Sequence, residues 1–232
     1  MTGQAGSTQP THNLPGRRRS GDPPRRTIRQ VGKVALPDDI VGVLACDAGI
    51  HCVDLTGSRA LGTATALSDW DFIVTTADFG AVRDALPSLT APLRPVVAQW
   101  DRLSRHWCYM MILAGPVKVD LIFDQPHAIE PPWLVNVATL AAIDDHFWDW
   151  ALWLASKHLA GRRDVVTAEL GKLHAHVLVP LGVAAIPDSL DEAVAGYEAA
   201  RDGWEKRLRL RVSRTAETAV LPSLRQLSAR PQ

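Results

Sequence analysis

Apolar and polar residues alternate along several short runs in the first 125 residues, as they do in half-buried strands. The clearest run is 117–123, in which every second residue from Val117 to Phe123 is apolar. The pattern predicts strands at 51–55, 70–75, 93–99, 107–113 and 117–123. The turn Ala114-Gly115-Pro116 predicts a hairpin between the last two strands. Two helices are predicted, one from Pro37 to Ala48 and one from about Ala77 to Leu86, ended by Pro87.

After Pro131-Pro132 the apolar residues recur with a helical period of 3.6. Helices are predicted at 133–143, 147–159, 165–177 and 190–209, with a break between Pro180 and Pro187. We therefore expect an α+β protein, with a mixed β-sheet and flanking helices at 34–130 followed by an all-helical C-terminal domain at 131–232. The boundary lies near 128–145.

Composition changes sharply along the chain. Residues 1–33 are rich in Gly, Pro, Ser and Thr and hold seven basic residues and one acid, which predicts a disordered basic tail. Residues 34–150 hold six basic and fifteen acidic residues, a net charge of −9. A surface of that sign repels polyphosphate backbones and attracts cations, so we expect no nucleic-acid partner.

The chain has no apolar run of about 18 residues, so no transmembrane helix is expected. No apolar segment follows Arg17-Arg18-Arg19, so no secretory signal is expected. The three cysteines form no CxxC pair, which favours a reducing, cytoplasmic setting.

Asp69 and Asp71 are two residues apart at a predicted strand, so their side chains face the same side. Two carboxylates side by side are costly unless a cation lies between them. Two Mg²⁺ ions about 3.5–4 Å apart are a usual solution, because Mg²⁺ prefers hard oxygen ligands. Asp120 lies on the face of its strand opposite the apolar residues. If that strand pairs beside 70–75, Asp120 reaches the same metals, as a ligand or as a general base.

Gly57-Ser58 stands where a strand ends and a short helix begins, at about Arg59. Glycine lets backbone N–H groups approach a phosphate, and the Ser58 hydroxyl adds a donor. Arg59 either neutralises phosphate charge or pairs with an acid. Ser68 is expected to cap the entry to the metal-binding strand and to belong, with Gly57, Ser58 and Arg59, to the nucleotide-binding site.

The run from Thr56 to Asp71 resembles the polymerase-beta-like nucleotidyltransferase superfamily, over about residues 38–125. Its signature is a hydrophobic strand, Gly-Ser, Asp-x-Asp and a third carboxylate on a later strand. Gly57 and Ser58, Asp69 and Asp71, and Asp120 match those places. The resemblance implies two Mg²⁺ ions and transfer of a nucleotidyl group, AMP if ATP is the donor, to a hydroxyl with release of pyrophosphate.

The remainder is similar to bacterial aminoglycoside and lincosamide nucleotidyltransferases, which confer antibiotic resistance. Phe147-Trp148 and Lys157 resemble the helix that follows the catalytic domain in such proteins, where a lysine commonly contacts the triphosphate. Some members also take a carboxylate base from the helical region, for which Asp144, Asp145 and Asp149 are candidates. The resemblance and the acidic charge together predict a cationic small-molecule acceptor such as an aminoglycoside.

Three alternatives remain open at this point: a nucleotidyltransferase acting on RNA or protein, an antitoxin-type partner with the same fold, and a degenerate binding module. The aromatic residues at 147, 148, 150 and 153 either stack a nucleobase or, as is more usual, pack between helices. The eight histidines form no metal-binding pattern. The sequence leaves the acceptor, the nucleobase and the oligomeric state open.

Overall fold

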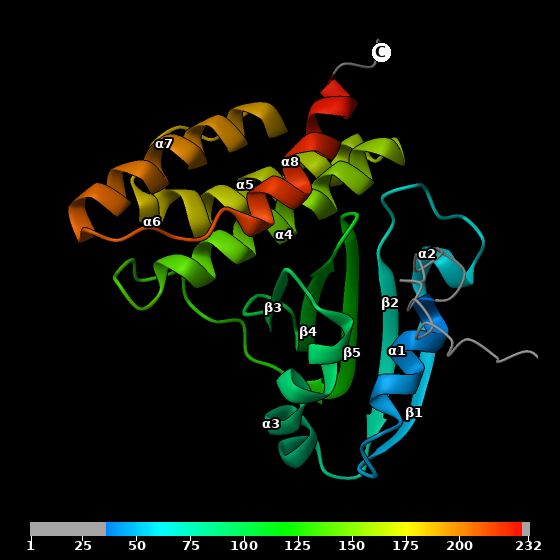
Figure 1. Ribbon diagram of the computed structural model, residues 1–232. Coiled ribbons are helices and arrows are strands. Elements are labelled where there is room, and N and C mark those ends of the chain that lie inside the picture. The colour runs from blue at the N-terminus through cyan, green and yellow to red at the C-terminus, as the bar shows by residue number, and fades with distance from the viewer. Residues whose placement is uncertain (1–35, 229–232) are drawn as a thin grey trace, which may run out of the picture. The chain divides into compact units, whose positions relative to one another are not determined.

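The computed structural model describes residues 36–228, so the predicted basic tail lies outside the described residues. Their first half forms a five-stranded sheet with flanking helices (Figure 1). Its elements are α1 (Leu36–Leu44), β1 (Ile50–Thr56), α2 (Gly57–Ala60), β2 (Trp70–Thr76), α3 (Phe79–Thr90), β3 (Val97–Trp100), β4 (His106–Leu113) and β5 (Val117–Pro126). The strand order is β1-β2-β5-β4-β3. β2 and β5 run parallel, and the other neighbours run antiparallel, so the sheet is mixed.

One face of this sheet is covered by α1 and α3. Alternate residues of β2, β4 and β5, such as Phe72 and Leu121, are buried in an apolar cluster with these helices. Ile40 of α1 and Leu86 of α3 belong to the same cluster. The alternation read from the sequence therefore assigns this face correctly, and the residues between, including Asp71 and Asp120, belong to the other face.

The second half of the described chain is helical, with no strand among residues 127–228. Its elements are α4 (Leu140–Leu159), α5 (Arg163–Leu173), a π-helical turn (His174–Leu178), α6 (Val179–Leu181), α7 (Leu190–Leu208) and α8 (Thr215–Ser228). Phe147 of α4 stacks on Tyr197 of α7 with ring centroids 3.7 Å apart. Val97 and Ile112 of the sheet share one apolar cluster with α4, which therefore packs against the face left open by α1 and α3.

The predicted α+β class is confirmed: a mixed sheet with flanking helices is followed by a helical region. Whether that region is a separate domain beginning near residue 131 stays a prediction. No helix among residues 36–228 is long and apolar enough to cross a membrane.

Several predicted boundaries are wrong, each for a local reason. α1 ends at Leu44 rather than Ala48, because the Asp47 carboxylate accepts a hydrogen bond from the Gly49 N–H and closes a turn. α3 continues past Pro87 to Thr90, because the buried stripe of Val82 and Leu86 extends to Thr90.

The two helices predicted at 133–143 and 147–159 are one helix, α4, which begins only at Leu140. The preceding segment is a turn, in which the Asn136 carboxamide accepts hydrogen bonds from the N–H groups of Ala138 and Thr139. The helix predicted at 165–177 changes to a π-helical turn at His174, and α8 was not predicted.

A buried lysine joins the sheet to the helical region. Lys118 of β5 donates hydrogen bonds to both carboxylate oxygens of Asp149 on α4, each at 2.8 Å, and to Asp120 Oδ1 at 2.7 Å. Only 3% of the Lys118 side chain is exposed. Burial alone would lower the pKa of this amine, but the two carboxylates raise the pKa well above its usual value. Lys118 is therefore charged and fully engaged.

We expect Lys118→Met to destabilise the protein by about 3–5 kcal/mol, because it leaves Asp149 buried without a counter-ion. Denaturant unfolding of the metal-free protein measures the loss. Lys172→Met is the matched control, because the Lys172 side chain is 63% exposed and its ion pair with Glu169 is worth about 0–1 kcal/mol. The double variant Lys118→Met/Asp149→Leu should recover part of the loss. A loss below about 1 kcal/mol for Lys118→Met would contradict this account.

Candidate active site

Three carboxylates meet on the face of the sheet that α4 covers. The parallel register of β2 and β5 places Asp71 directly beside Asp120, and Asp69 immediately precedes β2. One carboxylate oxygen from each residue lies within 4.8 Å of the others. The structure thus brings together the three acids that the sequence singled out.

The cluster holds more negative charge than its surroundings balance. Asp69 is 4% exposed, and its Oδ1 has no hydrogen-bond partner among the described residues. Burial, opposed in part by Lys118, raises the pKa of Asp69. Burial raises the pKa of Asp71 to about 6, with further contributions from Asp69 and Asp120. A buried, unpartnered carboxylate oxygen beside two more acids is the donor set that Mg²⁺ requires, so these residues fit a divalent metal site.

Gly57 makes room for one of these acids. Its φ is +67°, a conformation that favours glycine, and a Cβ added there would overlap the Asp71 carboxylate. The close approach follows from the β1–β2 ladder, in which Thr56 pairs with Asp71. The turn that starts α2 is therefore built against the acid cluster, and any larger residue at position 57 would displace Asp71.

The loop between α2 and β2 is held by Arg59. Its guanidinium donates hydrogen bonds to the carbonyl oxygens of Ser68 and Asp69, at 3.0 Å from Nε in each case. The guanidinium carbon also lies 4.1 Å from the centroid of the Trp70 ring. The Ser68 hydroxyl accepts a hydrogen bond from the Thr65 N–H at 2.8 Å, which closes the turn before β2. Both residues thus fix the backbone that carries Asp69.

Arg59 and Ser68 were predicted to bind nucleotide, as was Ser58. Burial lowers the pKa of Arg59, opposed by the charges of Asp69 and Asp71. The Ser58 carbonyl accepts a hydrogen bond from the Thr63 N–H at 2.9 Å, which fastens the loop to the start of α2. Phosphate contacts by these three residues stay predictions.

Lys157 reaches the acid cluster from α4. Its Nζ lies 3.5 Å from Asp69 Oδ2 and 4.8 Å from the centroid of the Trp153 ring. The side chain is 30% exposed, so the amine lies at the edge of the cluster. Lys157 therefore lies beside the acids, and its contact with a triphosphate stays a prediction.

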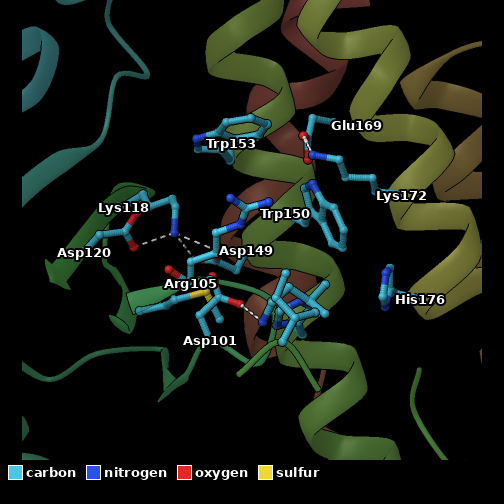
Figure 2. A pocket seen from close by; sticks show the side chains of 15 residues that line it. Asp101, Arg105, Lys118, Asp120, Asp149, Trp150, Trp153, Glu169, Lys172 and His176 are labelled. Atoms are coloured by element: carbon cyan, nitrogen blue, oxygen red, sulfur yellow. Dashed lines mark hydrogen bonds and ion pairs between the residues drawn. The ribbon is translucent and has the colours of Figure 1, made fainter. Parts of the chain in front are cut away.

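A pocket of about 610 Å³ adjoins the cluster between β4, β5, α4 and α5 (Figure 2). Asp120 and Lys118 lie at its β5 side, and Asp149, Trp150 and Trp153 project from α4. The pocket thus opens next to the third carboxylate of the cluster.

Of the three acids proposed as a base on α4, only Asp149 lines this pocket. Burial raises the pKa of Asp149, opposed by the charge of Lys118. Asp144 instead accepts hydrogen bonds from the Tyr197 hydroxyl at 2.6 Å and from Arg201, so it serves the contact between α4 and α7. Burial, and then the charge of Asp144, raises the pKa of Asp145 to about 6.

Lys118 was missed in the sequence. The available signal was its position two residues before Asp120, on the same face of a strand. A lysine between apolar residues on the functional face of a strand needs a buried acid as partner. The sequence could not show that the acid comes from residue 149.

Comparisons with known proteins give only distant similarities. No family model matches the chain. A segment of 101 residues, 43% of the chain, is 27% identical to the uncharacterized transporter YycB of Bacillus subtilis (strain 168), and the match spans about a quarter of that protein's length.

Among solved structures, an aminoglycoside 6-adenyltransferase from Bacillus subtilis is similar over 84% of this chain and 97% of its own, with 11% identity and a TM-score of 0.32. The polymerase core of TRAMP, an RNA surveillance complex, is similar over 79% of this chain and 59% of its own, with 10% identity and a TM-score of 0.35. Similarities of this size establish neither family nor activity, so the functional argument rests on the geometry of the site.

Proposed function

We propose that this protein is a nucleotidyltransferase, which transfers a nucleotidyl group from a nucleoside triphosphate to a hydroxyl of a small molecule and releases pyrophosphate. The observation that carries the proposal is the cluster of Asp69, Asp71 and Asp120, with oxygens within 4.8 Å, beside a lysine and a pocket of about 610 Å³. ATP is the expected donor, which makes the transferred group AMP.

Asp69, Asp71 and Asp120 are the residues that would hold two Mg²⁺ ions. When bound, such ions neutralise the charge of a triphosphate and activate an attacking hydroxyl. Asp69 and Asp71 come from one chain segment and Asp120 from the neighbouring strand, so the sheet itself fixes their spacing. A rigid site of this kind lowers the cost of reorganisation during the reaction.

The remaining groups position the donor. Lys157 forms an ion pair with Asp69 in the metal-free protein. When metal ions neutralise Asp69, the Lys157 amine is free to contact the triphosphate. Gly57 keeps the start of α2 free of side-chain atoms beside Asp71, which leaves backbone N–H groups open to phosphate oxygens. Ser58, Arg59 and Ser68 belong to the same proposed nucleotide site.

The acceptor enters from the pocket. Its volume falls within the range of roughly 300–1,000 Å³ that is usual for small-molecule sites. The hydroxyl proton passes to Asp120, which faces both the cluster and the pocket. Asp149 is the other candidate base, but Lys118 donates hydrogen bonds to both of its carboxylate oxygens. The acidic net charge of residues 34–150 by itself favours a cationic acceptor such as an aminoglycoside. How many charges the acceptor carries depends on the residues that line the pocket.

Asp71→Asn and Asp120→Asn are each expected to reduce kcat by more than about 100-fold, since even residues behind metal ligands cost 10–100-fold when removed. Both variants should also lose the increase in Tm that Mg²⁺ or Mn²⁺ gives the wild-type protein. Asp124→Asn is the matched control, because Asp124 is an exposed carboxylate further along β5. Near-normal turnover of either variant would show that the substituted residue is not a metal ligand of the active site.

Metal-free stability gives a second test. The pKa of Asp71 in the folded protein is about 6, above the ordinary value of 3.8, so its ionisation opposes folding above about pH 6. That penalty is lost as the pH falls through 6 towards 4. Asp71→Asn should therefore raise Tm in EDTA at pH 8, with a gain that shrinks at pH 5. A lower Tm at pH 8 would show that no such repulsion exists.

The activity is tested with ATP, Mg²⁺ and a panel of aminoglycosides, lincosamides, RNA and protein, by following pyrophosphate and product mass. We expect a product from a small molecule only. If the acceptor is cationic, kcat/KM should fall as ionic strength rises, because the steering field is screened. Efficient labelling of RNA or protein, with no small-molecule product, would reject the proposed acceptor class.

A further inference from the structure

The pocket beside Asp120 has an aromatic wall. Trp150 and Trp153 are three residues apart on α4, so they lie on the same side of the helix, and both project into the pocket (Figure 2). Both indoles are partly exposed rather than buried in the helical core. Leu103, Met110 and Ile129 add apolar surface to the other walls. A ligand in this pocket therefore meets flat and apolar surfaces first.

The charged groups of the pocket are mostly occupied by one another. Its lining includes four acids and three bases: Asp101, Asp120, Asp149 and Glu169, and Arg105, Lys118 and Lys172. Lys118 holds Asp149 and Asp120, and Lys172 Nζ lies 2.5 Å from Glu169 Oε1. With Asp120 assigned to the metal cluster, three acids face three bases.

One carboxylate, Asp101, and one guanidinium, Arg105, are left over, because neither forms an ion pair within the described part of the chain. Asp101 forms no ion pair with any residue between 36 and 228, although its Oδ1 accepts a hydrogen bond from the Leu103 N–H at 2.7 Å. The imidazole of His146, which also lines the pocket, adds no charge near neutral pH, because burial lowers its pKa to about 3. A ligand with several ammonium groups would find a single free carboxylate here, together with the free guanidinium of Arg105, which repels it.

His176 reaches the pocket from the π-helical turn His174–Leu178. Such turns are rare and occur frequently at functional sites, because they shift the register of the side chains that follow. The turn is a separate sign that this wall is built for a ligand.

We propose that the pocket selects an acceptor with a hydroxyl group, a flat apolar face and at most one positive charge, rather than a polycation. The apolar face packs on Trp150 and Trp153, and a single ammonium group is met by Asp101. The hydroxyl points to Asp120. That this ligand is the acceptor rests on the proposed function, whereas the chemical class of the ligand rests on the pocket alone.

The test is calorimetric binding without nucleotide, so that it does not depend on transfer. The neutral probe is 4-nitrophenyl β-glucoside, the monocationic probe is 4-(aminomethyl)phenyl β-glucoside, and methyl β-glucoside lacks the aromatic face. Kanamycin is the polycation. We expect both aryl glucosides to bind at least about tenfold more tightly than methyl glucoside, in line with the stacking energy of one ring.

The variants separate the two walls. Trp150→Ala should weaken both aryl glucosides at least about tenfold and Trp150→Phe much less, because Phe keeps a ring to stack on. Trp153→Ala is the second variant, and Trp204→Ala on α7 is the matched control outside the pocket. Asp101→Asn should weaken only the monocation, since the amide oxygen keeps the hydrogen bond to Leu103. Circular dichroism confirms folding.

Two results would overturn the proposal. One is aryl glucosides that bind no more tightly than methyl glucoside. The other is kanamycin binding more tightly than both aryl probes, with an affinity that falls with salt and survives Trp150→Ala. Binding as expected without any nucleotidyl transfer to the bound probes or to the wider acceptor panel would support the ligand class and count against the proposed function alone.

Discussion

The ion pairs of Lys118 are the contact on which the rest of this structure depends. The Lys118 side chain is 3% exposed, and its amine pairs with Asp120 on the same strand and with Asp149 on α4. It thereby fixes the third acid of the cluster, docks the helical region on the sheet and closes one wall of the pocket. A buried charge is tolerated only when all of its partners are present, so the loss of one of these ion pairs would disturb all three features.

In the acid cluster, by contrast, the buried charges lack a full set of partners. Its carboxylates are close, largely buried and incompletely balanced, and burial raises the pKa of both Asp69 and Asp71. Such an arrangement costs folding free energy in the absence of a cation. The packing of Phe72 and Leu121 on the other face holds the strands in register in spite of that repulsion. The proposed divalent metal would relieve that repulsion.

The net charge of the sheet region and the ion pairs around the pocket lead to different expectations about the acceptor. The acidic excess of residues 34–150 predicted a cationic acceptor such as an aminoglycoside, yet most acids in and around the pocket already pair with specific residues of the protein. Asp144 binds Tyr197 and Arg201, Asp149 binds Lys118, and Glu169 binds Lys172. Two of these partners, Tyr197 and Arg201, lie far along the chain in α7. A count of charges over residues 34–150 therefore cannot show which acids are already paired.

The sequence by itself determined the class of fold, the three acids and the strands other than β3, which begins at Val97 rather than at residue 93. Strand periodicity and the Gly57 to Asp71 motif are local properties. It failed where local rules were overridden, as at Pro87, where a continuous buried stripe outweighs the break, and at 133–139, where side chains cap a turn. Only the tertiary structure decided that β2 and β5 are parallel neighbours, that Lys157 meets Asp69 and that Lys118 pairs with Asp149. These contacts join residues 31 to 88 positions apart, and their energies arise from burial, which exists only once the chain has packed.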